Sequence, residues 1–201
     1  GGSKLTSIAQ NAFGECPTLK NVTIPASVKT IGRECFAGCR ALESVTFEKG
    51  SKLTTIGNKL FYACYALKSI TIPASVETIG EYCFYCCPAL ESVTFEEVSK
   101  LTSIAQKAFG ECPALMSITI PASVETIGEF CFAYCYALES VTFEKGSKLT
   151  TIGDNAFDSC EALKSITIPA SVETIGEYSF AGCSKLSSVT IGESVTGIGV
   201  S

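Results

Sequence analysis

Histidine and tryptophan are absent from this 201-residue chain, and methionine occurs once. Without histidine, the chain lacks the side chain whose ordinary pKa lies nearest neutrality, and with it the commonest general base and metal ligand of enzymes. Charged residues make up only 17% of the chain, and the net charge of −5 includes no basic cluster that would hold a phosphate backbone. No apolar run reaches the roughly 18 residues that cross a bilayer. We therefore expect no nucleic-acid partner and no membrane span.

The most prominent feature of the chain is internal repetition, which is the first pattern to look for in any sequence. Similar segments of 23 residues begin at Leu5, Leu53, Leu101 and Leu149. Related segments of 25 residues begin at Val28, Val76, Val124 and Val172. These segments make eight units, followed by a partial ninth, in a single predicted domain covering residues 1–201. Because the first residues match the inside of a later linker, we expect a fragment of a longer array without polar caps.

Each unit contains a short run in which polar and apolar residues alternate, such as residues 69–72. Its β-branched residues favour a strand, and the proline that follows in the 23-residue units ends it. A second short extended piece, V-x-T-I-G, comes next, and the segment after it predicts a helical or irregular turn. A single unit is too short to bury its own apolar face, so equivalent strands are expected to stack in parallel. The prediction is a repeat solenoid with one parallel β-strand per 23- or 25-residue unit, mostly β plus irregular or short helical turns.

The shared pattern L-x-x-I-x-x-x-x-F-x-x-C-x-x-L-x-x-I-x-I-P-x-S-V runs through residues 5–199. It resembles the BspA-like, or Treponema pallidum-type, leucine-rich repeats. The resemblance implies a leucine-rich repeat solenoid, a place on the cell surface or in the secreted fraction, and a role in adhesion to host matrix or cells. The periodicity by itself indicates only a solenoid.

Twelve cysteines are the unusual feature of this chain. Eight of them close the repeated F-x-x-C tetrad: Cys16, Cys39, Cys64, Cys87, Cys112, Cys135, Cys160 and Cys183. A buried ladder of free thiols is the favoured interpretation, because stacked equivalents have parallel Cβ directions whereas a disulfide needs converging ones. The four extra cysteines are Cys35, Cys83, Cys86 and Cys131, whose spacing leaves zinc or redox chemistry as the alternative to packing. We expect no metal and no other cofactor.

Two surfaces are candidates for binding. In each strand the hydroxyl-bearing residues are expected to point outward, next to a column in which opposite charges alternate from unit to unit. The candidate strand face consists of Ser69, Thr71, Glu91, Ser92, Thr94, Met116, Ser117, Thr119, Glu139, Ser140 and Thr142. Repeat proteins bind partners on such extended sheets, although strand propensity and cross-strand charge pairs explain the same pattern without a ligand.

The second candidate is an aromatic patch in the turn segments of the middle units, formed by Tyr62, Tyr65, Tyr82, Tyr85, Phe130, Tyr134 and Tyr136. Exposed tyrosine is enriched at protein interfaces, but it also covers core edges with its hydroxyl in water.

These features favour a non-enzymatic binding module that recognises a protein or glycan through its repeat face. The alternative is a structural spacer or idealised scaffold with no ligand, whose ends self-associate end to end or along strand edges. A third alternative is ice binding by the hydroxyl columns. An enzyme is disfavoured because nearly every polar residue recurs in other units, whereas an active site needs a unique constellation.

Overall fold

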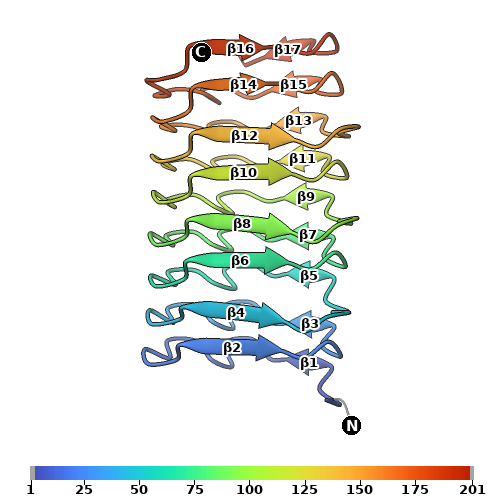
Figure 1. Ribbon diagram of the computed structural model, residues 1–201, viewed down its shortest axis with the longest axis vertical. Coiled ribbons are helices and arrows are strands. Elements are labelled where there is room, and N and C mark those ends of the chain that lie inside the picture. Colours follow the sequence, from blue (N-terminus) through green and yellow to red (C-terminus); the bar gives the residue numbers. More distant parts are fainter. Residues whose placement is uncertain (1–2, 200–201) are drawn as a thin grey trace.

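The computed structural model describes residues 3–199 and shows a straight column of stacked coils, one repeat unit per coil (Figure 1). The longer strands lie on one side of the column: β2 (Asn21–Ile24), β4 (Ser44–Phe47), β6 (Ser69–Ile72), β8 (Ser92–Phe95), β10 (Ser117–Ile120), β12 (Ser140–Phe143), β14 (Ser165–Thr167) and β16 (Ser188–Thr190). Two-residue strands lie behind them: β1 (Ser7–Ile8), β3 (Thr30–Ile31), β5 (Thr55–Ile56), β7 (Thr78–Ile79), β9 (Ser103–Ile104), β11 (Thr126–Ile127), β13 (Thr151–Ile152), β15 (Thr174–Ile175) and β17 (Gly197–Ile198).

The predicted solenoid with a parallel strand in every unit is confirmed, and the second extended piece also forms a ladder. The connecting segments are turns, and residues 3–199 contain no helix, so the short helical turns allowed for in the prediction are replaced by irregular ones. No helix in this part of the chain is long and apolar enough to cross a membrane.

The strand alternation places apolar side chains inside the column and hydroxyl groups outside it. In β6, Ile70 and Ile72 are buried whereas Ser69 and Thr71 are exposed. Parallel pairing keeps equivalent residues in register, for example Ser69 with Ser92, so each inward and outward position becomes a continuous row along the column.

The longer strands pair in twos. β10 and β12 are in register from Ser117 to Ile120, but β12 and β14 pair only at Ser140 and Ser165. Within a close pair, the amide of Glu144 donates to the carbonyl of Ile120. The equivalent donor one coil later is the nitrogen of Pro169, which has no hydrogen, so the ladder opens there. The 23- and 25-residue units therefore alternate in pairing as well as in length.

The centre of the column is a continuous row of eight phenylalanines, the F of each F-x-x-C tetrad. Neighbouring rings are stacked with centroids 5.0–5.8 Å apart and ring planes within 18° of each other. The six inner rings, from Phe36 to Phe157, are fully buried, and only the ring in the first coil, Phe13, is largely exposed, at 43%. Each buried ring contributes roughly 1.5–3 kcal/mol through removal from water, so the column has one uninterrupted core.

The segments around each phenylalanine form a third ladder between coils. The amides of Glu34, Phe36 and Gly38 donate to carbonyls of the next coil. For alternate amides to point toward the next coil, the residues two before and two after each phenylalanine take a positive φ. Most of these residues are not glycine, as Lys59 (φ 54) and Ala63 (φ 55) illustrate. We call the surface of these segments the turn face.

Candidate functional site

The structure brings all eleven residues of the predicted strand face together on one exposed surface. They lie in, or directly before, β6, β8, β10 and β12. The hydroxyls of Thr71 and Thr94 lie 2.9 Å apart and form a hydrogen bond across the coils, and Met116 is 53% exposed among the polar side chains. The result is an exposed, polar and nearly uniform surface, whose role in binding stays a prediction.

The residues directly before the longer strands form a column in which opposite charges alternate, and this column contains ion pairs in two places. Lys164 lies 2.6 Å from Glu139, and Lys20 lies 3.8 Å from Glu43. The hydrogen bond that Lys164 donates to the exposed carboxylate of Glu139 lowers the pKa of Glu139. Water and salt screen exposed pairs of this kind, so they add little to stability, and the column leaves most of its charge available to solvent or to a partner.

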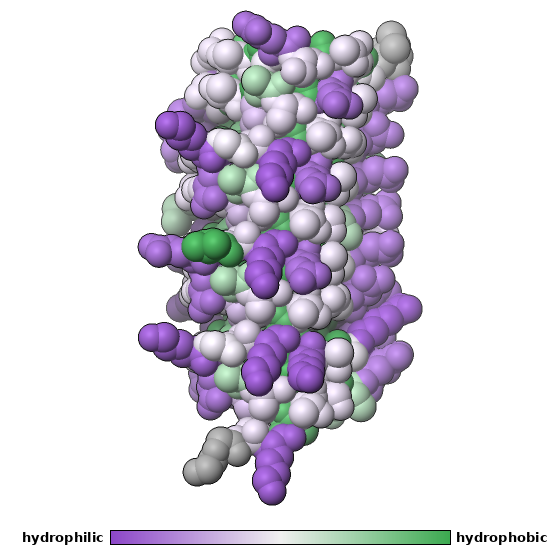
Figure 2. Space-filling view, turned by 90° about the vertical axis from the view of Figure 1, so that its right-hand side faces the viewer, coloured by the Kyte–Doolittle hydropathy of each residue, from purple (hydrophilic) through white to green (hydrophobic). Residues whose placement is uncertain are grey.

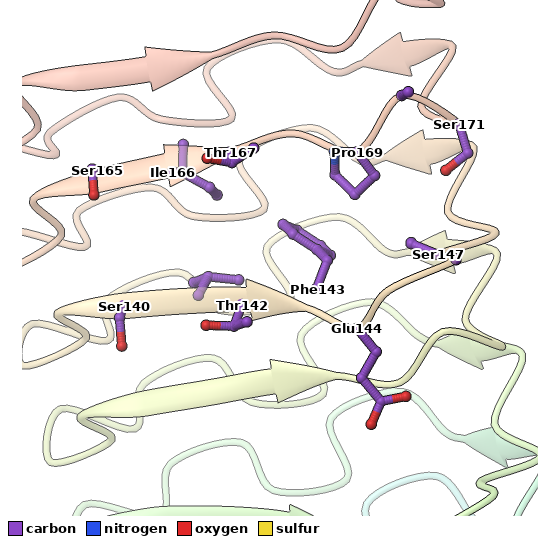
Figure 3. A pocket seen from close by; sticks show the side chains of 13 residues that line it. Ser140, Thr142, Phe143, Glu144, Ser147, Ser165, Ile166, Thr167, Pro169 and Ser171 are labelled. Carbon is purple, nitrogen blue, oxygen red and sulfur yellow. The ribbon is translucent and has the colours of Figure 1, made fainter.

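A groove with a volume of about 540 Å³ lies where the ladder opens between β12 and β14 (Figure 3). The ring of Phe143 points into it from one coil and Pro169 from the next. Glu144 turns away, and its carboxylate accepts the amide of Ala122 at 2.9 Å. The hydroxyl of Ser171 is buried at the edge of the groove without a hydrogen-bond partner among residues 3–199. The groove follows from the missing proline amide and contains no group with evident chemistry.

The linkers that follow the longer strands form another side of the column. Figure 2 views this side and shows strongly hydrophilic side chains in vertical rows, with one strongly hydrophobic side chain about midway along the column. Among residues 3–199 the most exposed large apolar residue belongs to a linker: Val98 is 91% exposed and has φ 58. Glycine occupies the equivalent places, Gly50 and Gly146, with φ 78. The backbone at Val98 is therefore strained. A comparison of the units by sequence shows that valine stands here where the equivalent linkers have glycine.

Part of the predicted aromatic patch forms a compact cluster with two lysines on the turn face. The lysine–aromatic cluster consists of Lys59, Tyr62, Tyr82, Tyr85, Lys107 and Phe130. Tyr62 and Tyr85 are stacked at 5.9 Å, and Tyr82 meets Tyr85 edge-on at 5.4 Å. The Lys59 ammonium lies 5.8 Å from the rings of both Tyr62 and Tyr82, and the Lys107 ammonium lies 5.0 Å from Phe130 and 5.4 Å from Tyr82. These cation–π contacts already occupy the ring faces within the protein.

The other predicted tyrosines lie apart from that cluster. Tyr65 is covered on one side by the guanidinium of Arg40, whose central carbon is 5.5 Å from the ring centroid. Tyr134 and Tyr136 pack against each other at 6.3 Å and line a depression that we call the tyrosine pocket. This pocket is formed by Cys86, Pro88, Glu111, Pro113, Tyr134 and Tyr136.

Tyr85 links the cluster to the pocket through a hydrogen bond from its hydroxyl to the Glu111 carboxylate. Burial and this carboxylate raise the pKa of Tyr85, so the phenol stays protonated and donates. The aromatic residues were predicted from the sequence, whereas the lysines, Glu111 and the prolines were not. Aligning the eight units draws attention to this region, because the turn positions around F-x-x-C vary more from unit to unit than the strand positions do.

The tetrad cysteines lie inside the column. All twelve cysteines are free, and the tetrad residues are buried except for Cys16 and Cys183 in the outermost coils. Three of the extra cysteines are buried beside the phenylalanine row, whereas Cys86 is partly exposed. Burial, followed by the charge of Glu111, raises the pKa of Cys86, which keeps it a neutral thiol. Within residues 3–199 no three side chains of His, Cys, Asp or Glu are grouped as a metal site.

Comparison with solved structures finds similar solenoids in bacterial proteins. The pneumococcal vaccine antigen PcpA is 26% identical with a TM-score of 0.75, and covers 95% of this chain. The Treponema pallidum leucine-rich repeat protein TpLRR is also 26% identical, has a TM-score of 0.71, and covers 96% of this chain. This chain spans 57% of the pneumococcal antigen and 77% of the T. pallidum protein.

A leucine-rich repeat protein from Bacteroides ovatus is 26% identical over 97% of this chain and 66% of its own, with a TM-score of 0.57. Among curated proteins, no significant sequence match is found. The model of the BspA type leucine-rich repeat region matches six copies, over residues 6–112 and 102–201. Since this match covers nearly the whole sequence, the chain belongs to the BspA-type leucine-rich repeat family.

Proposed function

We propose that this chain is a non-enzymatic binding module of a cell-surface or secreted protein, and that it recognises a protein or glycan through the strand face. The observation that carries the proposal is the exposed polar surface of β6, β8, β10 and β12, in which hydroxyl groups repeat in register and Met116 adds one apolar contact point. A wide, rigid surface of this kind suits a repeating or extended ligand, because little conformational entropy is lost on binding.

The similarity to a pneumococcal vaccine antigen supports a location outside the cell. Membership of the BspA-type family supports binding over catalysis, since the repeated side chains provide no unique set of nucleophile, base and orienting group. The partners proposed are therefore matrix or cell-surface proteins and polysaccharides.

The test is binding of the 201-residue chain, under reducing conditions, to immobilised matrix glycoproteins and polysaccharides. The variant carries Thr94→Lys, Thr119→Lys and Thr142→Lys, which place three long cations on the strand face. The matched control carries Thr30→Lys, Thr126→Lys and Thr174→Lys, which add the same charge to exposed positions of the short strands. Binding that is lost in the variant and kept in the control supports the strand face. Equal binding by both variants contradicts it.

The second candidate function is a spacer that provides length and stiffness. The uninterrupted phenylalanine row and the near-identical units favour it, because a continuous core resists bending and a uniform surface needs no ligand. Absence of binding to every member of the panel, by a chain that remains folded, favours the spacer.

A further inference from the structure

The tyrosine pocket lies on the turn face, away from the strand face, and has a volume of about 360 Å³. It spans three consecutive coils, and each coil contributes the residues two and four places after its phenylalanine. The residue between those two is the tetrad cysteine, which points inward. The flanking positions therefore form two outward rows, and in these three coils the rows contain two prolines, two tyrosines, a cysteine and Glu111.

The pocket is negatively charged. Tyr85 holds one carboxylate oxygen of Glu111, and the other oxygen has no hydrogen-bond donor among residues 3–199. None of the four ion pairs within residues 3–199 involves Glu111. The nearby Lys107 makes its two cation–π contacts with rings of the lysine–aromatic cluster. A partly buried carboxylate next to open aromatic rings attracts a cation more strongly than the same groups in water.

Elsewhere in the repeat, an arginine of the chain itself covers the tyrosine at the equivalent position. In the first three coils the same two rows form a second depression, which includes Arg40 and Tyr65, with Gly38 at the position of Glu111. There the Arg40 guanidinium stacks on the ring of Tyr65, the residue at the same place in the next coil. In the tyrosine pocket, Pro113 stands at the position of Arg40 and Tyr136 at that of Tyr65. The pocket thus retains the tyrosine, which is 46% exposed, but lacks the arginine that covers its counterpart.

We propose that the tyrosine pocket binds an arginine side chain of a protein partner. The guanidinium stacks on the ring of Tyr136 and donates to the free oxygen of Glu111, while Pro88 and Pro113 form an apolar floor under its methylene groups. Arginine suits the pocket better than lysine because its flat guanidinium both stacks on a ring and donates to a carboxylate in fixed directions. This site does not depend on the strand face, so either proposal stands without the other.

The test is an NMR titration of the 201-residue chain with the blocked peptide acetyl-Gly-Arg-Gly-amide, and in parallel with its citrulline counterpart, which keeps the shape and removes the charge. We expect binding of the arginine peptide with a dissociation constant on the order of 1 mM, seen in the ring signals of Tyr134 and Tyr136. Absence of these shifts with the arginine peptide at millimolar concentration, or equal shifts with citrulline, overturns the proposal.

Two variants locate the site without disturbing the fold. Glu111→Gln keeps an acceptor for Tyr85 and removes the charge, and Tyr136→Pro installs the residue that three other units have at this place. Both are expected to weaken arginine binding about tenfold or more. The matched control is Glu15→Gln, which makes the same change in the nearly identical first unit and is expected to leave the affinity unchanged. If Glu15→Gln and Glu111→Gln weaken binding equally, the pocket is not the site.

Discussion

The thiol of Cys112 donates to the carbonyl oxygen of Phe84, one coil earlier, with the sulfur 3.2 Å from the oxygen. The same contact recurs from the second coil to the eighth, at 3.0–3.3 Å. The phenylalanine carbonyl also accepts the amide of its own tetrad cysteine in most coils, as in Cys135 to Phe132. Cysteine therefore serves as a small apolar side chain that also satisfies the second lone pair of a buried carbonyl.

The first prediction concerns this ladder. Cys112→Ala removes the sulfur from a fully buried site and the donor from the Phe84 carbonyl, which we expect to lower the free energy of unfolding by about 1–2 kcal/mol. Cys16→Ala is the matched control, because Cys16 is partly exposed and its thiol donates to no carbonyl within residues 3–199, so its effect should stay below about 0.5 kcal/mol. Urea denaturation under reducing conditions measures both. Equal losses for the two variants would contradict the role of the ladder.

The second prediction concerns alkaline pH. Burial raises the pKa of Cys135 from 9.0 to about 12. Above pH 9 the unfolded chain loses this proton while the folded chain keeps it, so the stabilisation is complete below pH 9 and declines as pH rises toward 12. The unfolding free energy of the protein, taken relative to that of Cys135→Ala, should fall by about 2 kcal/mol from pH 8 to pH 10.5, enough to remove or reverse the advantage of cysteine. Urea titrations at both pH values measure this difference, and a constant difference would refute the prediction.

The third prediction concerns close contact between coils. A Cβ atom on Gly80 would lie 2.6 Å from the backbone nitrogen of Asn58 and 2.8 Å from the carbonyl carbon of Gly57. Gly80→Ala should therefore destabilise the fold by about 2–3 kcal/mol. At Gly57 the nearest atom would be 3.5 Å away, and alanine already occupies this place in other units, as Ala105. Gly57→Ala should leave the melting temperature unchanged or slightly higher, and a similar loss in both variants would exclude steric contact as the cause.

The sequence was sufficient to predict the solenoid, the strand and its outward face, because inward and outward positions repeat with the same residue types in every unit. Ile70 and Ile72 are buried and Thr71 is exposed, as their alternation predicts. Cys112 is likewise interior, as its fixed distance from the tetrad phenylalanine predicts. These features depend only on local periodicity, which a single sequence displays directly.

The turn face and the pairing in twos could not be predicted in this way. Lys59 and Tyr82 take a positive φ that their residue types do not favour, since the ladder between coils imposes it. The groove beside Phe143 arises because Pro169, in the next coil, has no amide hydrogen to donate. Both features depend on contacts between residues more than 20 positions apart, which become visible only when the coils are stacked.

The fourth prediction concerns Val98. A β-branched residue at φ 58 is strained by about 1–2 kcal/mol, and the side chain is 91% exposed, so little packing energy offsets the strain. Val98→Gly should stabilise the fold by about 1 kcal/mol after the larger chain entropy of glycine is subtracted. This corresponds to a rise of about 2–4 °C in melting temperature. The reverse change, Gly146→Val, should lower it by a similar amount, and a fall in melting temperature for Val98→Gly would show that the valine makes a favourable contact.

The fifth prediction concerns the two ends of the column, which expose residues of the core. Phe13 is 43% exposed at one end, and Ile198 is 56% exposed at the other. Within residues 3–199 the outer strands of the end coils have no partner on one side, so one copy can continue the ladders of another. We expect the mass in sedimentation equilibrium to rise with concentration, and a double variant with Phe13→Glu and Ile198→Glu to remain monomeric. The same two glutamates placed on the strand face, at Thr94 and Thr142, should leave association unchanged, because there they meet no apolar surface; loss of association in that control would move the contact from the ends to the strand face.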